Sequence, residues 1–316
     1  MLKTWTKIFL FLLCGLLLIG CSKGDEANKD NESYYRFVDD AGFEIVLNEK
    51  PKKVAVLFSS FAEVWTISGG EIAITVQESV DRGFASSEVL LVDGGAGKTI
   101  NHELLIEAQP DLVICSLDIE AQKETADLLH DVGIPAACFH VETFDDYLRM
   151  LKICTEITEN KEAYNQYGTE IETSIEELLG KIDTTKEKEK ILFIRCGSSA
   201  SSTKAKQAKD HFAAAMLNEI NTYNIAENAP ILLDGLSIEE ILIEDPNFIF
   251  VSTMGNEEAA KEYFNSVLQD PTWQSLSAVK NEHVIYLPKD LFQFKPNQRW
   301  DEAYRMLIEL VYGSKE

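Results

Sequence analysis

Five basic side chains lie in segments that could hold an anion. Arg82 follows one predicted strand, Arg195 ends another, and Lys204, Lys206 and Lys209 lie close together in one loop. This clustering stands out because the chain has 53 acidic and 29 basic residues and a formal net charge of −24. Arginine and lysine donate charge-assisted hydrogen bonds to anionic oxygens. The five side chains are candidates for binding an anionic ligand, although a solvated loop would also explain the three lysines.

Ligands of open α/β sheets bind outside the carboxyl ends of the strands, and we call this the strand-end rule. The rule points to further candidates. Ser59 and Ser60 follow the first apolar strand of the chain. Three aromatic side chains could stack on a flat ligand or pack in the core: Phe84, Phe292 and Phe294. These residues complete the predicted ligand-binding set, which contains no catalytic residue.

The elements that must position these residues form an α/β pattern. Continuous apolar strands are predicted at 53–58, 72–76, 111–116 and 135–141. Helices are predicted from 61 to about 69, and at 101–108 and 119–131. A pair of short strands around the turn at 39–42 precedes them. Buried strands alternating with helices predict a parallel sheet covered on both faces.

The pattern restarts after a long helical segment. Residues 143–181 have helical spacing, with Thr143 as a cap and a possible break at 159–161. Strands are then predicted at 190–195, 247–252 and 283–287, and helices at 210–220, 237–244, 257–269 and 297–312. The predicted fold is two Rossmann-like α/β lobes joined by a long connector helix, with a ligand cleft between the lobes.

An internal repeat supports two similar lobes. The segment NHELLIEAQPDLVICS, which begins at Asn101, aligns with SIEEILIEDPNFIFVS, which begins at Ser237. The offset is 136 positions both for the first acids (239 less 103) and for the prolines (246 less 110). Cap residue, acid, apolar pair, proline and strand recur in register. Ser237 and Glu240 also have the spacing of a capping box.

The N-terminus has the pattern of an export signal. Lys3 and Lys7 precede an apolar run at 8–19 that is too short to span a membrane comfortably, and the run is soon followed by Cys21. This arrangement resembles the lipobox of bacterial lipoproteins, which implies diacylglyceryl modification of Cys21. The predicted organisation is a signal peptide at 1–20, a flexible lipidated tether at 21–36, an N-terminal lobe at 37–142, a connector at 143–184 and a C-terminal lobe at 185–316.

Composition excludes several classes of function. The acidic surface repels phosphate backbones, which argues against nucleic-acid binding, and one apolar run is too few for a multi-span membrane protein. Each of Cys115, Cys138, Cys154 and Cys196 lies in an apolar run and is predicted to be a buried free thiol. The five histidines lack metal-site spacing, so no bare-metal site is predicted.

Taken together, these segments resemble the helical-backbone class of ABC-importer substrate-binding proteins, which handle siderophores, haem and vitamin B12. The resemblance is carried by the lipobox, the duplicated unit, FVDDAGFEIVLNEKPKKVAVL with the following SSFAEVW, and KPNQRWDEAYRMLIELVYG. In that family one acid on each lobe docks onto arginines of the permease. The matching positions here are Glu103 and Glu239.

The resemblance implies a lipid-anchored monomer on the outer side of the cell membrane that delivers an iron complex to an ABC permease. That permease would have two membrane subunits and a cytoplasmic ATPase. The ligand would be a metal chelate, and the lipid on Cys21 would be the only covalent group. Haem or a corrinoid such as cobalamin is an alternative ligand. A chelatase-like extracellular enzyme is a more distant alternative, for which no nucleophile–base motif is present.

Overall fold

The structure is a computed structural model, and it describes residues 33–94 and 99–313. From Ser33 onward the chain forms one compact unit. The predicted signal peptide and Cys21 lie outside the described residues. No helix in the described part is long and apolar enough to cross a membrane.

A short antiparallel hairpin opens the described chain. Strand β1 (Tyr35–Val38) pairs with β2 (Glu44–Leu47), so the fold begins inside the segment that was predicted to be a tether. In the turn, Asp39 accepts hydrogen bonds from the backbone N–H of Phe43 and of Cys138, both at 2.8 Å. Asp39 is 5% exposed, and these bonds attach the hairpin to the first lobe.

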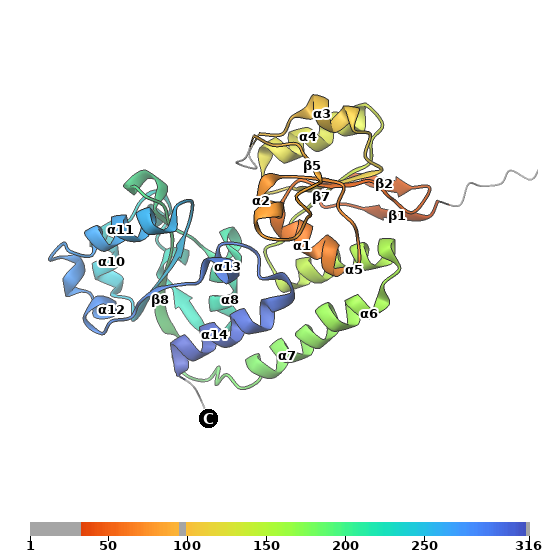
Figure 1. Ribbon diagram of the computed structural model, residues 1–316. Helices are drawn as coiled ribbons and strands as arrows, with labels where there is room; N and C mark the ends of the chain where they lie inside the picture. Colours follow the sequence, from red (N-terminus) through yellow and green to blue (C-terminus); the bar gives the residue numbers. More distant parts are fainter. Residues whose placement is uncertain (1–32, 95–98, 314–316) are drawn as a thin grey trace, which may run out of the picture. The chain divides into compact units, whose positions relative to one another are not determined.

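The first lobe is a parallel sheet with helices around it (Figure 1). Its strand order is β5-β4-β3-β6-β7. All of its strands except the edge strand β5 are buried, as apolar runs in a parallel sheet should be. The strands are β3 (Val54–Val56), β4 (Ile74–Thr75), β5 (Leu90–Leu91), β6 (Leu112–Ser116) and β7 (Ala136–Phe139). The helices are α1 (Ser59–Ile67), α2 (Gln77–Asp81), α3 (His102–Glu107) and α4 (Glu120–Asp131).

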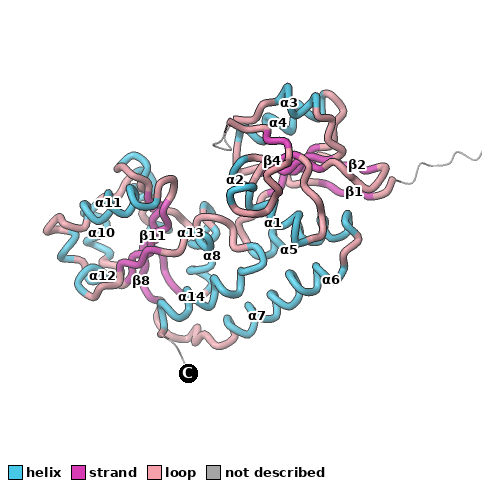
Figure 2. The backbone as a smooth tube through the Cα atoms, viewed as in Figure 1, coloured by secondary structure: helices cyan, strands magenta, loops and turns pink. Residues whose placement is uncertain are grey.

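The second lobe has a similar sheet, and both sheets are drawn in magenta in Figure 2. Its parallel order is β10-β8-β11-β12, and β9 pairs antiparallel with the end of β8. The strands are β8 (Glu189–Cys196), β9 (Lys204–Ala205), β10 (Thr222–Asn224), β11 (Phe248–Thr253) and β12 (Val284–Tyr286). The helices are α8 (Phe212–Glu219), α9 (Ile231–Asp234), α10 (Ile238–Glu244), α11 (Glu257–Val267), α12 (Ser277–Lys280), α13 (Lys289–Phe292) and α14 (Trp300–Tyr312).

The internal repeat is visible in the backbone. Gln109 and Asp245, at equivalent positions before the two prolines, both adopt positive φ, at 48° and 44°. The backbone N–H of Asp111 donates to the carbonyl of Lys53, just before β3, at 2.9 Å, and that of Asn247 donates to the carbonyl of Lys190 in β8 at 2.8 Å. Side chains other than glycine adopt positive φ infrequently, so this shared feature is specific evidence for duplicated lobes.

The connector consists of successive helices rather than one. Helix α5 (Phe144–Thr158) begins with a capping box between Thr143 and Asp146. The chain breaks at Glu159, whose φ is 63°, and continues through α6 (Lys161–Tyr164), a π-helical turn (Asn165–Thr169) and α7 (Glu170–Leu179). The predicted break at 159–161 is therefore confirmed. A Cβ atom on Gly168 would lie 3.1 Å from Leu148, so glycine permits this close approach.

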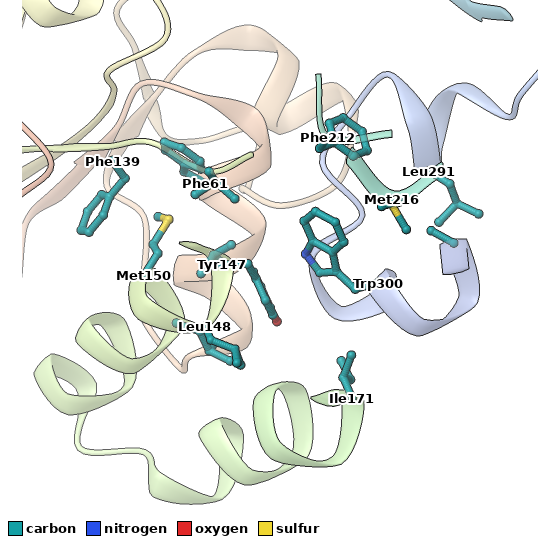
Figure 3. Packing of buried hydrophobic residues seen from close by; sticks show 14 of the residues in the cluster. Phe61, Phe139, Tyr147, Leu148, Met150, Ile171, Phe212, Met216, Leu291 and Trp300 are labelled. Carbon is teal, nitrogen blue, oxygen red and sulfur yellow. The ribbon is translucent and has the colours of Figure 1, made fainter. Parts of the chain in front are cut away.

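One apolar core joins the first lobe, the connector and part of the second lobe. Trp300, which is fully buried, lies at its centre (Figure 3). Its ring centroid is 6.0 Å from that of Phe144 and 6.5 Å from that of Tyr147 on α5, and 5.8 Å from that of Phe212 on α8. Cys115, Cys138, Cys154 and Cys196 are buried free thiols, as predicted.

Replacing Trp300 with alanine should lower the free energy of unfolding by about 3–5 kcal/mol, because it would leave a large cavity where three segments meet. Urea unfolding followed by circular dichroism measures the loss. Ile243→Ala is the matched control, since Ile243 is 76% exposed and its truncation should change stability by less than about 0.5 kcal/mol. A loss below about 1 kcal/mol for Trp300→Ala would show that the surrounding core does not depend on this ring.

Candidate functional site

A cavity of about 340 Å³ lies where strand ends of the two lobes face each other. Both apolar and charged side chains form its wall. The lining residues are Leu57, Phe58, Ser59, Val76, Glu78, Ser116, Asp118, Ile119, Glu142, Arg195, Asp210, His211, Phe212, Gln293, Phe294 and Lys295. Three of the predicted ligand-binding residues line it directly, namely Ser59, Arg195 and Phe294.

Arg195 is the most informative group in this wall. It occupies the end of β8, and no hydrogen-bond or ion-pair partner of its guanidinium is found among residues 33–94 and 99–313. Its Nε is buried. Burial lowers the pKa of Arg195, and the negative charge of Glu142 raises it in part. A partly buried cation without an acceptor is costly, so this position favours an anionic ligand oxygen.

A largely buried ion pair lies in the same cavity wall as Arg195. Lys295 Nζ donates to Glu142 Oε1 at 2.6 Å, and the two side chains are 10% and 19% exposed. The backbone N–H of Lys295 also donates to Ser60 Oγ at 3.3 Å, and its ammonium lies 5.0 Å from the centroid of the Phe212 ring. Lys295 is therefore held in place by both lobes.

His211 adds a neutral hydrogen-bond donor. Its Nδ1 accepts from the backbone N–H of Ala213 at 3.2 Å, which assigns the ring proton to Nε2. Burial and then the positive charges of Lys295, Arg195 and Lys206 lower the pKa of His211 well below 6.5. The imidazole is therefore uncharged at neutral pH and presents N–H rather than a lone pair at Nε2.

Helix α1 adds positive potential at the same cavity. It begins at Ser59, with no side-chain cap at Phe58 and no acid in its first turn. The acids Glu78, Asp118 and Asp210 line the cavity at exposed positions, where solvent screens them. The cations of the cavity wall are thus more buried than these three acids, so solvent screens the positive charges less than the negative ones.

Four other residues of the predicted ligand-binding set lie behind this wall or in the core. Arg82 does not line the cavity but donates to Ser59 Oγ at 3.0 Å and to Ser60 Oγ at 3.3 Å. Its guanidinium lies 4.0 Å from the ring centroid of Phe294 and 4.7 Å from that of Phe84. Arg82 therefore supports the wall that Ser59 and Phe294 form. Phe292 is fully buried in the core.

The three lysines also lie off the cavity wall. Lys204 is in β9, opposite Arg195 in the antiparallel register. Side chains at 203, 205 and 207 are buried, whereas Lys204 and Lys206 alternate with them and are partly exposed. This two-residue period turns the lysines away from the packed face of the loop. Lys209 is exposed, and only Lys206 influences a cavity residue, His211.

The docking candidates Glu103 and Glu239 are exposed on α3 and α10. Asn101 caps α3 by accepting from the backbone N–H of Leu104 at 3.0 Å. The predicted capping box of α10 is wrong, because Ser237 Oγ instead donates to Glu239 Oε2 at 3.2 Å.

Several cavity residues were missed because the strand-end rule was applied to too few strands. Ser116 and Asp118 follow β6, and Glu142 follows β7, so the same rule would have identified them. His211 has no comparable signal, since it lies in a loop between a short edge strand and α8.

Stability should fall as the pH drops below about 6.5, because the unfolded chain protonates His211 more readily than the folded protein does. The loss from this group approaches about 1.4 kcal/mol per pH unit until the folded pKa is reached. His211→Asn, which keeps an acceptor for Ala213, should remove that part of the pH dependence. Urea unfolding at about pH 7.5 and about pH 5.5 measures this pH dependence, and His102→Asn is the control variant. Equal pH dependence in the His211 variant and the wild type would contradict it.

Comparisons with known proteins agree with this architecture. The sequence profile described as "Periplasmic binding protein" matches residues 54–291. No curated protein matches the chain at the sequence level.

Solved structures share the fold at low identity. The vitamin B12 binding protein BtuF of Vibrio cholerae is 20% identical with a TM-score of 0.66, covering 84% of this chain and 99% of its own. SirA of Staphylococcus aureus, solved with staphyloferrin B, is 15% identical with a TM-score of 0.67, covering 88% and 98%. The haem-binding protein RhuT from Roseiflexus sp. RS-1 is 15% identical with a TM-score of 0.65, covering 84% and 99%. With its duplicated α/β lobes and its match over residues 54–291, the chain belongs to the periplasmic binding protein family.

Proposed function

We propose that this protein is the substrate-binding lipoprotein of an ABC importer, and that it captures a ferric siderophore or a similar anionic iron(III) complex. The observation that carries the proposal is the cavity-lining guanidinium of Arg195, which has no partner within the described part of the chain. Lys295 and the Nε2–H of His211 lie in the same wall and could donate to further oxygens of the ligand.

The donor set of the cavity favours a complex that brings all of its own metal ligands. No group of three or more His, Cys, Asp or Glu side chains in the described residues is placed to hold a metal ion. His211 would have to move its proton from Nε2 to Nδ1, and so lose the bond from Ala213, before it could coordinate iron. Haem, which commonly takes an axial protein ligand, therefore fits this cavity less well than a saturated chelate.

The proposal includes the anchor and the transport partners. Cys21 would carry the lipid and keep the protein at the outer face of the cell membrane. Glu103 and Glu239, one on each lobe, would dock on a permease of two membrane subunits.

Cys21→Ala should release the mature protein into the medium or leave an unprocessed precursor, because the lipid could no longer be attached. Unchanged membrane attachment of this variant would contradict the anchor.

Native mass spectrometry of protein purified from its own host medium tests the ligand. We expect an added mass equal to one iron(III) complex, and titration of stripped protein with that complex should show one site and no chemical turnover. Conversion of the complex would instead favour the chelatase-like enzyme. Failure of iron(III) siderophores to bind, with haem or a corrinoid retained, would reassign the ligand.

A further inference from the structure

Glu142 is an acid in an otherwise cationic part of the cavity wall. It follows β7, and its backbone N–H donates to Asp146 Oδ2 at 3.1 Å, which fixes the chain at this point. Oε1 accepts from Lys295 at 2.6 Å. Oε2 is buried, with no hydrogen-bond partner among the residues that the structure describes. Within the described residues, only one of the two carboxylate oxygens of Glu142 therefore takes part in a hydrogen bond.

The charge of Glu142 also acts on Arg195. Its carboxylate is the charged group that favours the protonated guanidinium, although no hydrogen bond joins the two side chains. One carboxylate thus shares the cavity wall with two cations, while His211 is neutral. The buried part of the wall keeps a net excess of one positive charge.

The exposed acids of the cavity have a smaller effect. Glu78 accepts from Ser59 Oγ, and Asp118 pairs with His140. Asp210 is exposed. Charges that face water are screened, whereas Glu142 and Lys295 are largely removed from solvent.

We infer that Glu142 is a resident counter-ion that determines how much negative charge the ligand can bring into the cavity. This inference rests on the proposed function for the identity of the ligand. A ligand oxygen that carries one negative charge balances the excess of the wall. Further negative charge on the buried part of the ligand is repelled by the carboxylate, which lies beside the same two cations. Glu142 is therefore a specificity-determining residue that selects against polyanionic complexes.

Glu142→Gln tests this, because glutamine keeps an acceptor for Lys295 and removes the charge. Mono-, di- and tricarboxylate anions of similar size are the first probes, measured by NMR titration, since they require no metal. A neutral ferric tris-hydroxamate and a triply anionic ferric tris-catecholate are the second probes, measured by fluorescence titration. We expect the variant to gain about tenfold or more in affinity for the most highly charged member of each set, with less than about threefold change for the least charged.

Two further variants separate charge from shape. Glu142→Asp keeps the charge and should keep the wild-type ranking even if it weakens binding overall. Glu88→Gln removes an exposed acid of the first lobe that does not line the cavity, and it should leave the ranking unchanged. The inference is overturned if Glu142→Gln keeps the wild-type ranking, or if it weakens all probes equally, which would make Glu142 a structural or ligand-bonding group.

The outcome also separates this inference from the proposed function. A shifted ranking among the carboxylates without any binding of the ferric complexes would support the role of Glu142 and contradict the iron ligand. Binding of a ferric complex with an unshifted ranking would support the iron ligand and contradict the role of Glu142.

Discussion

Removing both candidate docking acids, by Glu103→Ala together with Glu239→Ala, should abolish uptake of the ligand by cells while the purified protein still binds it normally. Both side chains are exposed and occupy the same register in duplicated units, one on each lobe. An acid in the first turn stabilises a helix by about 0.3–1 kcal/mol. That local effect does not account for matched positions on two lobes, whereas two-point docking on a permease does.

Uptake of radiolabelled iron complex, permease pull-down and thermal unfolding measure the three parts of this prediction. The matched control is Glu107→Ala with Glu240→Ala, which removes one acid from each of the same helices. Normal uptake by the Glu103 and Glu239 variant would eliminate the docking assignment. Loss of ligand binding would instead place these acids in the fold or the cavity.

Arg195→Gln should weaken binding of the anionic ligand by about 1.5–3 kcal/mol, roughly ten- to hundredfold, because a charge-assisted hydrogen bond is lost. The same change should leave the stability of the ligand-free protein equal or slightly raised. The reason is that it removes a partly buried charge that has no partner among the described residues. Such opposite effects distinguish a binding residue from a structural one.

Isothermal titration and urea unfolding of the same preparations test both parts. Lys204→Gln is the control, since Lys204 lies opposite Arg195 in the strand register but does not line the cavity. Strong destabilisation by Arg195→Gln with unchanged affinity would show that the guanidinium serves the fold.

Local patterns in the sequence predicted the two α/β lobes and the connector, but not the short strands β5, β9 and β10. Continuous apolar runs identified the buried strands, and helical spacing with Thr143 as a cap identified the connector. The duplicated unit predicted equivalent lobes, and the matched backbone at Gln109 and Asp245 agrees with it. These features can be predicted because they depend on the types and spacing of residues that are close together in the sequence.

The strand-end rule predicted part of the cavity wall. It identified Ser59, Arg195 and Phe294, because parallel strands bring their carboxyl ends to one edge. It could not say that Arg82 contacts Ser59 and Phe294 and does not line the cavity. The direction of a long side chain depends on what packs around it.

The charge balance of the cavity was decided only by the tertiary structure. Lys295 meets Glu142 across 153 positions of sequence, and Asn297 donates to the backbone of Ser60 across 237. The proton position of His211 depends on a backbone bond to Ala213 and on burial among cations from other segments. Pairings at such separations follow from how the lobes and the C-terminal segment pack together, and desolvation then sets the strength of each charge.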